Sequence, residues 1–145
     1  MVAEHLVVDA SVVAKLYLRD EQHTAKADLL FSRFQRGEVQ LIAPRLITYE
    51  VPAAIKRGAV RVKAVEEIWQ AALSSFESLG LSVVDDSDAK YEATRLAINY
   101  ACSYYDALYL LLAEDLGCSF ITADERLWRT MRTRVKYLSL LASYG

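Results

Sequence analysis

The sequence predicts an α/β fold, a three-layer α/β/α domain with a central, mostly parallel sheet. Short apolar runs of strand length alternate along the chain with longer segments whose apolar residues recur every three or four positions. Strands that alternate with helices imply a parallel sheet with right-handed crossovers and helices on both faces. The length of 145 residues suits a single domain spanning residues 1–145, and two prolines with five glycines leave no linker.

The first half of the chain contains two predicted strands and four predicted helices. Glycine or proline follows four of these elements, at Gly37, Pro44, Gly58 and Gly80, and we expect each of these residues to end the element before it. In chain order the predicted elements are a buried strand within the apolar stretch Leu6–Ala14 that stops at Asp9, a helix over Ala10–Leu18, a helix striped by Ala27, Leu30, Phe31 and Phe34, a strand over Val39–Ala43, a helix over Leu46–Arg57, and a long amphipathic helix striped from Val65 to Leu79.

The second half repeats the alternation. Ser103 and Asp106 form an S-x-x-D sequence that resembles a capping box, ahead of a helix that is apolar all round and therefore predicted to be buried. In chain order the predicted elements are a strand over Leu81–Val84, a helix that starts near Asp85–Asp88 and carries Ala93, Leu96, Ala97, Tyr100 and Ala101 on one face, the buried helix Ala107–Ala113, a strand over Ser119–Thr122, a helix over Asp124–Met131, and a last short strand over Val135–Leu138.

Composition excludes several classes of protein. Hydrophobic residues make up 54% of the chain and charged residues 25%, which is typical of a globular protein with a core. Cys102 and Cys118 lack the spacing of a zinc site or a disulfide scaffold. The N-terminus has no basic region followed by a long apolar core, and the Ala107–Ala113 run is too short to span a bilayer. We therefore expect a cytoplasmic protein without a membrane partner.

Charge is distributed unevenly along the chain. The formal net charge of −2 gives no general attraction to nucleic acid, so any such binding needs local patches or metal ions. Five basic and two acidic residues lie between Asp124 and the C-terminus. A second cluster, which contains no acid, consists of Lys56, Arg57, Arg61 and Lys63. Either cluster is a candidate contact surface for a polyanion or a partner.

Four carboxylates stand at predicted strand ends or helix starts: Asp9, Glu50, Asp106 and Asp124. Taken singly, each fits a structural role, because Asp9 and Asp124 suit helix N-caps, Asp106 suits the first turn of a helix and Glu50 suits an exposed helix face. Taken together they predict a site, since the carboxyl ends of parallel strands meet at one edge of the sheet. Carboxylates gathered there require a counter-charge, and Mg²⁺ or Mn²⁺ prefers oxygen ligands.

At these residues the chain resembles the PIN-domain family, and within it the VapC type of ribonuclease toxin, along nearly its whole length. The matching segments are V-V-D-A-S at Val7–Ser11, A-P-R-L-I-T-Y-E-V at Ala43–Val51, S-Y-Y-D-A at Ser103–Ala107 and T-A-D at Thr122–Asp124. The chain departs from many relatives at Pro52, Ala53 and Ala54, where they carry an asparagine shortly after the helix glutamate.

The resemblance implies a role for each matched residue. Asp9, Glu50, Asp106 and Asp124 would be the catalytic acids that hold one or two Mg²⁺ or Mn²⁺ ions, and Ser11 and Thr122 would orient carboxylates or water. The implied activity is metal-dependent hydrolysis of RNA phosphodiesters by an endonuclease, leaving 5′-phosphate and 3′-hydroxyl ends. His5 and His23 are the only histidines and neither stands at a strand end, which disfavours a metal-free route that uses a histidine base.

The chain is also expected to have binding partners, and two other functions remain possible for it. The resemblance implies a small antitoxin protein, and the helix around Trp69 and Phe76 is a candidate surface for it or for a homodimer or higher homo-oligomer, with core burial as the other use of that stripe. RNA phosphates are expected on Arg126, Arg129 and Arg132, which also fit a solvated helix face. A PIN nuclease of RNA processing and an inactive PIN-like interaction module remain as alternative functions. Ser11 disfavours a haloacid-dehalogenase-type phosphatase, which needs a second aspartate there.

Overall fold

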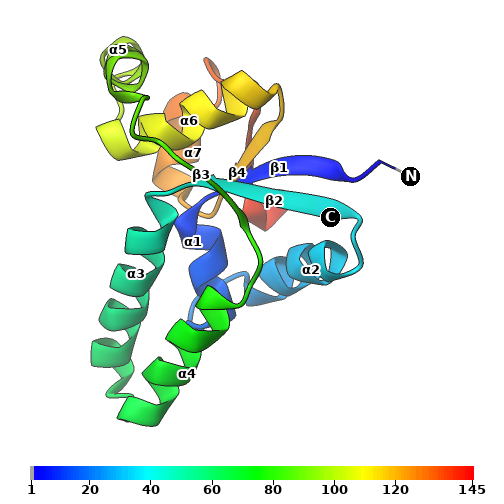
Figure 1. Cartoon of the computed structure of the whole chain (residues 1–145), viewed down its shortest axis with the longest axis vertical. Helices are drawn as coiled ribbons and strands as arrows, with labels where there is room; N and C mark the ends of the chain where they lie inside the picture. Colours follow the sequence, from blue (N-terminus) through cyan, green and yellow to red (C-terminus); the bar gives the residue numbers. More distant parts are fainter. Residues whose placement is uncertain (1) are drawn as a thin grey trace.

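A computed structural model describes residues 2–145 and contains a five-stranded sheet in which every pairing is parallel (Figure 1). The strand order is β3-β2-β1-β4-β5, so the first strand of the chain lies at the centre. Their bounds are β1 (Glu4–Val8), β2 (Val39–Pro44), β3 (Ser82–Val84), β4 (Ser119–Thr122) and β5 (Leu138–Leu140). The α/β class and the layered arrangement predicted from the alternation are confirmed, and the sheet is parallel throughout.

Helices cover the sheet on both sides. Helices α5 and α6 lie on one side, and α1 to α4 lie on the other (Figure 1). Their bounds are α1 (Ala10–Val13), the 3₁₀ turn η1 (Ala14–Leu16), α2 (Thr24–Gln35), α3 (Ile47–Val62), α4 (Glu66–Glu77), α5 (Lys90–Tyr100), α6 (Tyr104–Leu116), α7 (Glu125–Met131) and the 3₁₀ turn η2 (Leu141–Ser143). No helix within residues 2–145 is long and apolar enough to cross a membrane.

The core lies where the central strands meet these helices. Val7 and Val8 of β1 and Leu41 of β2 are completely buried, as expected for strands that are covered on both faces. The helix predicted to be apolar all round is α6, and five of its residues are buried: Ala107, Leu108, Tyr109, Leu110 and Ala113. Because β1 is packed on both faces, the position of the residue that follows it, Asp9, is rigidly determined.

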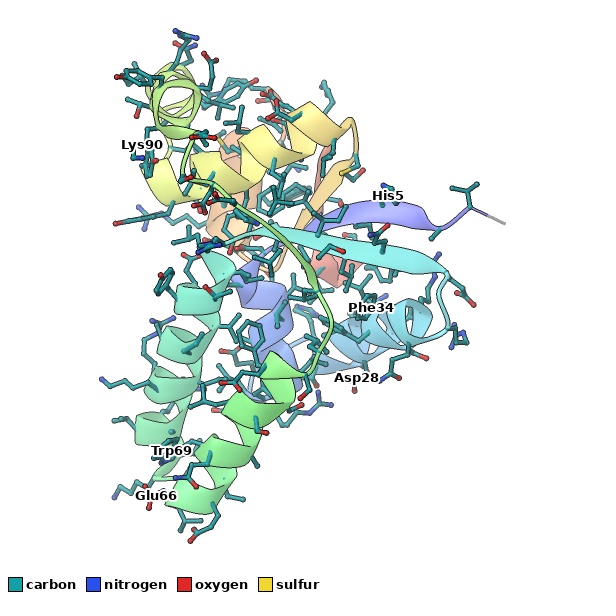
Figure 2. All side chains as sticks on the ribbon, in the orientation of Figure 1. His5, Asp28, Phe34, Glu66, Trp69 and Lys90 are labelled. Atoms are coloured by element: carbon teal, nitrogen blue, oxygen red, sulfur yellow. The ribbon has the colours of Figure 1, made fainter. Side chains whose placement is uncertain are left out.

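Helices α3 and α4 form an antiparallel arm that extends away from the sheet (Figure 1). Glu66 and Trp69 lie near its far end (Figure 2). No residue of α4 is fully buried. Trp69, Ala72, Leu73, Phe76 and Leu79 pack partly buried against the core, whereas Val65 and Ile68 are each 62% exposed. The stripe predicted on this helix is therefore only partly used inside the chain.

Several predicted boundaries are wrong. Gly58 does not end α3, which continues to Val62 and ends where Lys63 adopts a left-handed φ of 54°. Gly58 instead allows a close approach, because a Cβ there would lie 2.1 Å from Leu18 Cδ2. The last strand is Leu138–Leu140 rather than Val135–Leu138, α5 begins at Lys90, and the first helix gives way to a 3₁₀ turn after Val13.

Candidate active site

Asp9 follows β1 at the carboxyl edge of the sheet, and its carboxylate is held by two hydroxyl groups. Ser11 Oγ donates to Asp9 Oδ2 at 2.8 Å, and Thr122 Oγ1, from the end of the neighbouring strand β4, donates to the same oxygen at 2.7 Å. Asp9 is only 8% exposed. Its side chain makes no capping hydrogen bond to α1. The orientation of the carboxylate is therefore set by the two hydroxyl groups and not by a capping interaction.

The two hydroxyls are themselves held by the backbone of the β4–α7 connection. Ser11 Oγ accepts from the Ala123 N–H at 3.0 Å, and Thr122 Oγ1 accepts from the Asp124 N–H at 3.0 Å. Each hydroxyl therefore donates to Asp9 and accepts from a different peptide group. This network ties the end of β1 to the end of β4 and leaves Asp9 Oδ1 outside both hydrogen bonds.

Glu50 lies in the first turn of α3, and a tyrosine of α6 holds it. Tyr109 Oη donates to Glu50 Oε1 at 2.7 Å. The Tyr109 ring is 1% exposed and stacks on Phe120 of β4, with centroids 5.4 Å apart. Glu50 is partly buried, so the suggested role as an exposed helix residue does not apply.

Sequence reasoning missed Tyr109, although a signal for it exists. Tyr109 follows Asp106 by three residues on α6, which places the two side chains on the same face of that helix. A polar hydroxyl in an otherwise apolar helix needs a buried partner. Its partner lies 59 residues away in the sequence, so local patterns do not identify it.

Asp106 and Asp124 each begin a helix. The Ser103 hydroxyl accepts from the Asp106 N–H at 2.9 Å, which confirms the N-cap predicted from the S-x-x-D sequence. Asp124 is the N-cap of α7 and accepts from the Leu127 N–H at 3.1 Å through Oδ1. Asp124 therefore does cap α7, and its second oxygen, Oδ2, takes no part in that hydrogen bond.

The charges of these acids influence one another. The pKa of Asp9 is raised to about 6, chiefly by burial; the hydrogen bonds from Thr122 and Ser11 oppose this rise, and the charges of Glu50 and Asp106 add to it. Burial also raises the pKa of Glu50, the Tyr109 hydrogen bond lowers it, and Asp106 raises it. The pKa of Asp106 is raised by burial, lowered by the Ser103 hydrogen bond and raised by Asp124. Each of the four acids therefore lies within electrostatic reach of at least one of the others.

The four carboxylates have the right donor atoms for a hard divalent cation, but they are too far apart in this structure to bind one together. Carboxylate oxygens are the ligands that Mg²⁺ and Mn²⁺ prefer. Within residues 2–145, however, no group of three or more His, Cys, Asp or Glu side chains is placed closely enough to hold a metal ion. The acids repel one another, and Asp9 and Glu50 are held separately by their hydroxyl partners. Joint binding of a cation therefore requires these side chains to move toward it.

Two hollows lie on either side of Asp124. The first, which we call the Arg57 hollow, has a volume of about 630 Å³ and is lined by Ser11, Lys15, Arg57, Arg61 and Asp124, with other residues. The second, of about 410 Å³, is lined by Ser103, Asp106, Asp124 and Arg126, with other residues. Asp124 therefore faces two spaces large enough for substrate groups.

The three arginines predicted to contact RNA are placed differently from one another. Arg126 lines the second hollow beside Asp106 and Asp124. Arg132 instead lies over the Trp128 ring, 4.8 Å from its centroid, and Arg129 is exposed on α7. Of the three, Arg126 alone is among the residues that line either hollow.

The two histidines are placed differently relative to the four acids. His5 belongs to the N-terminal part of β1, away from the carboxyl edge (Figure 2). His23 lines the Arg57 hollow, is exposed and lies 4.0 Å from Glu125. Neither hydrogen-bonds to one of the four carboxylates in the described part of the chain.

Known proteins resemble this chain along most of its length. Residues 6–132 match the sequence profile of the family described as PIN domain. The chain is 29% identical over 126 residues to "Ribonuclease VapC3" of Pyrobaculum aerophilum, covering 84% of this chain and 91% of that protein. It is 30% identical over 125 residues to "Ribonuclease VapC9" of Mycobacterium tuberculosis, covering 84% and 87% respectively.

A solved structure supports the same relationship. The crystal structure of PAE2754 from Pyrobaculum aerophilum superimposes with a TM-score of 0.69 at 26% sequence identity. The alignment covers 99% of this chain and 94% of that one. The arrangement of the sheet and helices is therefore shared over the whole described chain.

Proposed function

Because the chain belongs to the PIN domain family, we propose that it is a ribonuclease that hydrolyses RNA phosphodiesters with the help of Mg²⁺ or Mn²⁺. The observation that carries this proposal is the buried Asp9 carboxylate at the carboxyl edge of the sheet, within electrostatic reach of Glu50 and Asp106. A bound cation would stabilise the ionised form of this buried carboxylate against the burial and the acidic neighbours that raise its pKa. The similarity to proteins named VapC ribonucleases supports RNA as the substrate.

The roles of the residues follow from their positions. Asp9, Glu50, Asp106 and Asp124 would hold the cation directly or through water, and Ser11 and Thr122 keep the buried Asp9 oxygen in place. When bound, such a cation supplies a water of lowered pKa and stabilises charge on the phosphate. Tyr109 holds Glu50 in one orientation. Arg126 lies beside two of the acids, where it would bind an RNA phosphate.

We further propose that the chain acts as one domain and as the toxin of a toxin–antitoxin pair, as the names of its relatives suggest. In this proposal a small antitoxin protein covers the nuclease site and keeps it inactive. The exposed apolar residues of the α3–α4 arm, including Val60, Val65 and Ile68, are a candidate surface for that protein or for a homodimer or higher homo-oligomer.

The decisive experiment is cleavage of a defined RNA by the purified protein with Mg²⁺, with Mn²⁺ and with EDTA, followed by mapping of the product ends. We expect cleavage only with a divalent cation, and products with 5′-phosphate and 3′-hydroxyl ends. Asp9→Asn should abolish cleavage and leave the circular dichroism spectrum unchanged. Metal-independent cleavage, or full activity of Asp9→Asn, would contradict the proposal.

The toxin role needs a separate experiment. Expression of the chain should arrest growth, and Asp9→Asn should not. Co-expression of a small antitoxin partner should restore growth and should yield a complex on size-exclusion chromatography. A chain that cleaves RNA in vitro and has no effect on growth would instead favour the RNA-processing alternative.

A further inference from the structure

The Arg57 hollow contains seven charged side chains, most of which neutralise one another. Lys15 Nζ lies 3.3 Å from Glu21 Oε1, and Arg61 makes two hydrogen bonds to Asp20, at 2.8 Å and 3.0 Å. Glu125 lies 4.0 Å from the imidazole of His23. Three ions in the hollow, Arg57, Asp124 and Glu125, have no ion pair with an oppositely charged Asp, Glu, Lys or Arg side chain among the described residues, and Arg57 is the cation among them.

Arg57 shares a face of α3 with the catalytic glutamate. Glu50, Ala54, Arg57 and Arg61 follow one another at helical spacings of four, three and four residues, which places them in one stripe. The last three of these line the hollow, and the charge of Arg57 lowers the pKa of Glu50. Ala54, which stands between Glu50 and Arg57 in this stripe, borders the same hollow as Arg57.

We propose that Arg57 binds a backbone phosphate of the RNA adjacent to the one that is cleaved, in the Arg57 hollow. This inference rests on the proposed nuclease function. Arg57 is exposed and makes no ion pair within residues 2–145, so a phosphate need not displace a carboxylate from it. Asp124 stands in the same hollow and also borders the second hollow, where Arg126 lies. The RNA backbone then runs past the acids from Arg126 to Arg57.

A charge-matched control stands at the next position of the same helix. Lys56 is also exposed, but it lines an apolar groove between α3 and α4, together with Trp69 and Leu73. Arg57→Gln and Lys56→Gln remove the same charge from adjacent residues that face different sides of α3. Neither side chain makes an ion pair within residues 2–145, so both variants should fold, which thermal unfolding will verify.

The test is the binding of a fluorescent RNA oligonucleotide in EDTA, followed by anisotropy over a series of salt concentrations at pH 8. We expect Arg57→Gln to bind about five- to tenfold more weakly, and to lower the slope of log K against log salt by about 0.7, the value for one phosphate contact on a single strand. Lys56→Gln should match the wild type. Because Lys56→Gln removes the same charge from the same helix, it controls for any effect of the lost positive charge that does not require contact with RNA.

Cleavage measurements separate this inference from the proposed function. If the wild type cleaves RNA with Mg²⁺, Arg57→Gln should raise KM more than it lowers kcat. Equal RNA affinity and equal salt dependence of Arg57→Gln and the wild type would overturn the inference and leave the nuclease function intact; the hollow would then suit an acidic side chain of a partner protein. A wild type that binds RNA through Arg57 and never cleaves it would overturn only the nuclease function.

Discussion

Tyr109 Oη donates a hydrogen bond of 2.7 Å to Glu50 Oε1, which joins α6 to the first turn of α3 across 59 residues of sequence. The tyrosine ring is buried against Phe120, so the hydroxyl has a fixed position before any ligand binds. A carboxylate held in this way presents its second oxygen in a defined direction. Tyr109 is therefore a positioning residue for Glu50.

Removal of the hydroxyl tests this relationship. Tyr109→Phe should lower kcat about tenfold with little change in KM, and should cost about 1 kcal/mol of stability for the lost hydrogen bond. Because the hydrogen bond lowers the pKa of Glu50, the acidic limb of the pH–rate profile should move to higher pH. Tyr105→Phe removes a hydroxyl from an exposed residue of the same helix and should behave as the wild type. An unchanged pH profile in Tyr109→Phe would show that Tyr109 has only a structural role.

The buried carboxylate of Asp9 should make the protein less stable as pH rises. Its pKa is raised to about 6, above the ordinary value of 3.8, so between these values the folded chain binds a proton more tightly than the unfolded chain. The stability that comes from this tighter proton binding is fully present below about pH 4 and is lost as pH rises through 6. Relative to the wild type, Asp9→Asn should therefore gain on the order of 3 kcal/mol between pH 4 and pH 7.5.

Urea unfolding in EDTA at the two pH values measures this difference. Asp20→Asn is the control, since Arg61 lowers the pKa of Asp20 and the stability that this carboxylate contributes is lost only below about pH 4. The stability difference between this variant and the wild type should therefore change little between pH 4 and pH 7.5. With Mg²⁺ at pH 7.5 the wild type should be stabilised and Asp9→Asn should not. A stability difference between Asp9→Asn and the wild type that does not depend on pH would contradict the assignment of Asp9.

The arginines of α7 should contribute unequally to RNA binding. The variant Arg126/Arg129/Arg132→Ala should cleave RNA more weakly and with less sensitivity to salt. Most of this effect should be reproduced by Arg126→Ala, because Arg126 lines the hollow beside Asp106 and Asp124. Arg132→Ala should leave RNA affinity near that of the wild type, since the guanidinium lies over Trp128. Equal effects of the two single variants in anisotropy titrations would argue for an RNA path along the exposed face of α7.

Gly58 should resist substitution by alanine despite its place inside a helix. Alanine gains about 1 kcal/mol of helix propensity over glycine. The new Cβ would lie 2.1 Å from Leu18 Cδ2, and overpacking of this kind costs about 1–3 kcal/mol. We expect a net loss of about 1 kcal/mol in chemical denaturation. In the Leu18→Ala background the same substitution should be stabilising, and a gain in both backgrounds would contradict the close contact.

Much of the fold follows from local patterns in the sequence. The alternation of apolar runs with helical stripes identifies the parallel sheet, because hydrophobic periodicity depends only on near neighbours. The same patterns place Asp9 after β1 and Asp124 before α7, and the S-x-x-D sequence identifies the cap of α6. Helix ends are less well predicted, since the local sequence around Gly58 is typical of a helix end, whereas in the structure Gly58 lies inside α3 and allows the close approach of Leu18.

The arrangement of the candidate site was decided by tertiary structure alone. Thr122 lies 113 residues from Asp9 in sequence and shares a hydrogen bond with it only because β4 pairs with β1. In the same way, packing of α6 against β1, β2 and β4 brings Tyr109 to Glu50, and pairing within the Arg57 hollow leaves Arg57 as its cation without an ion pair among the described residues. The sequence by itself determined which acids stand at the carboxyl edge of the sheet. Which groups hold and surround them depends on long-range packing, which no local period encodes.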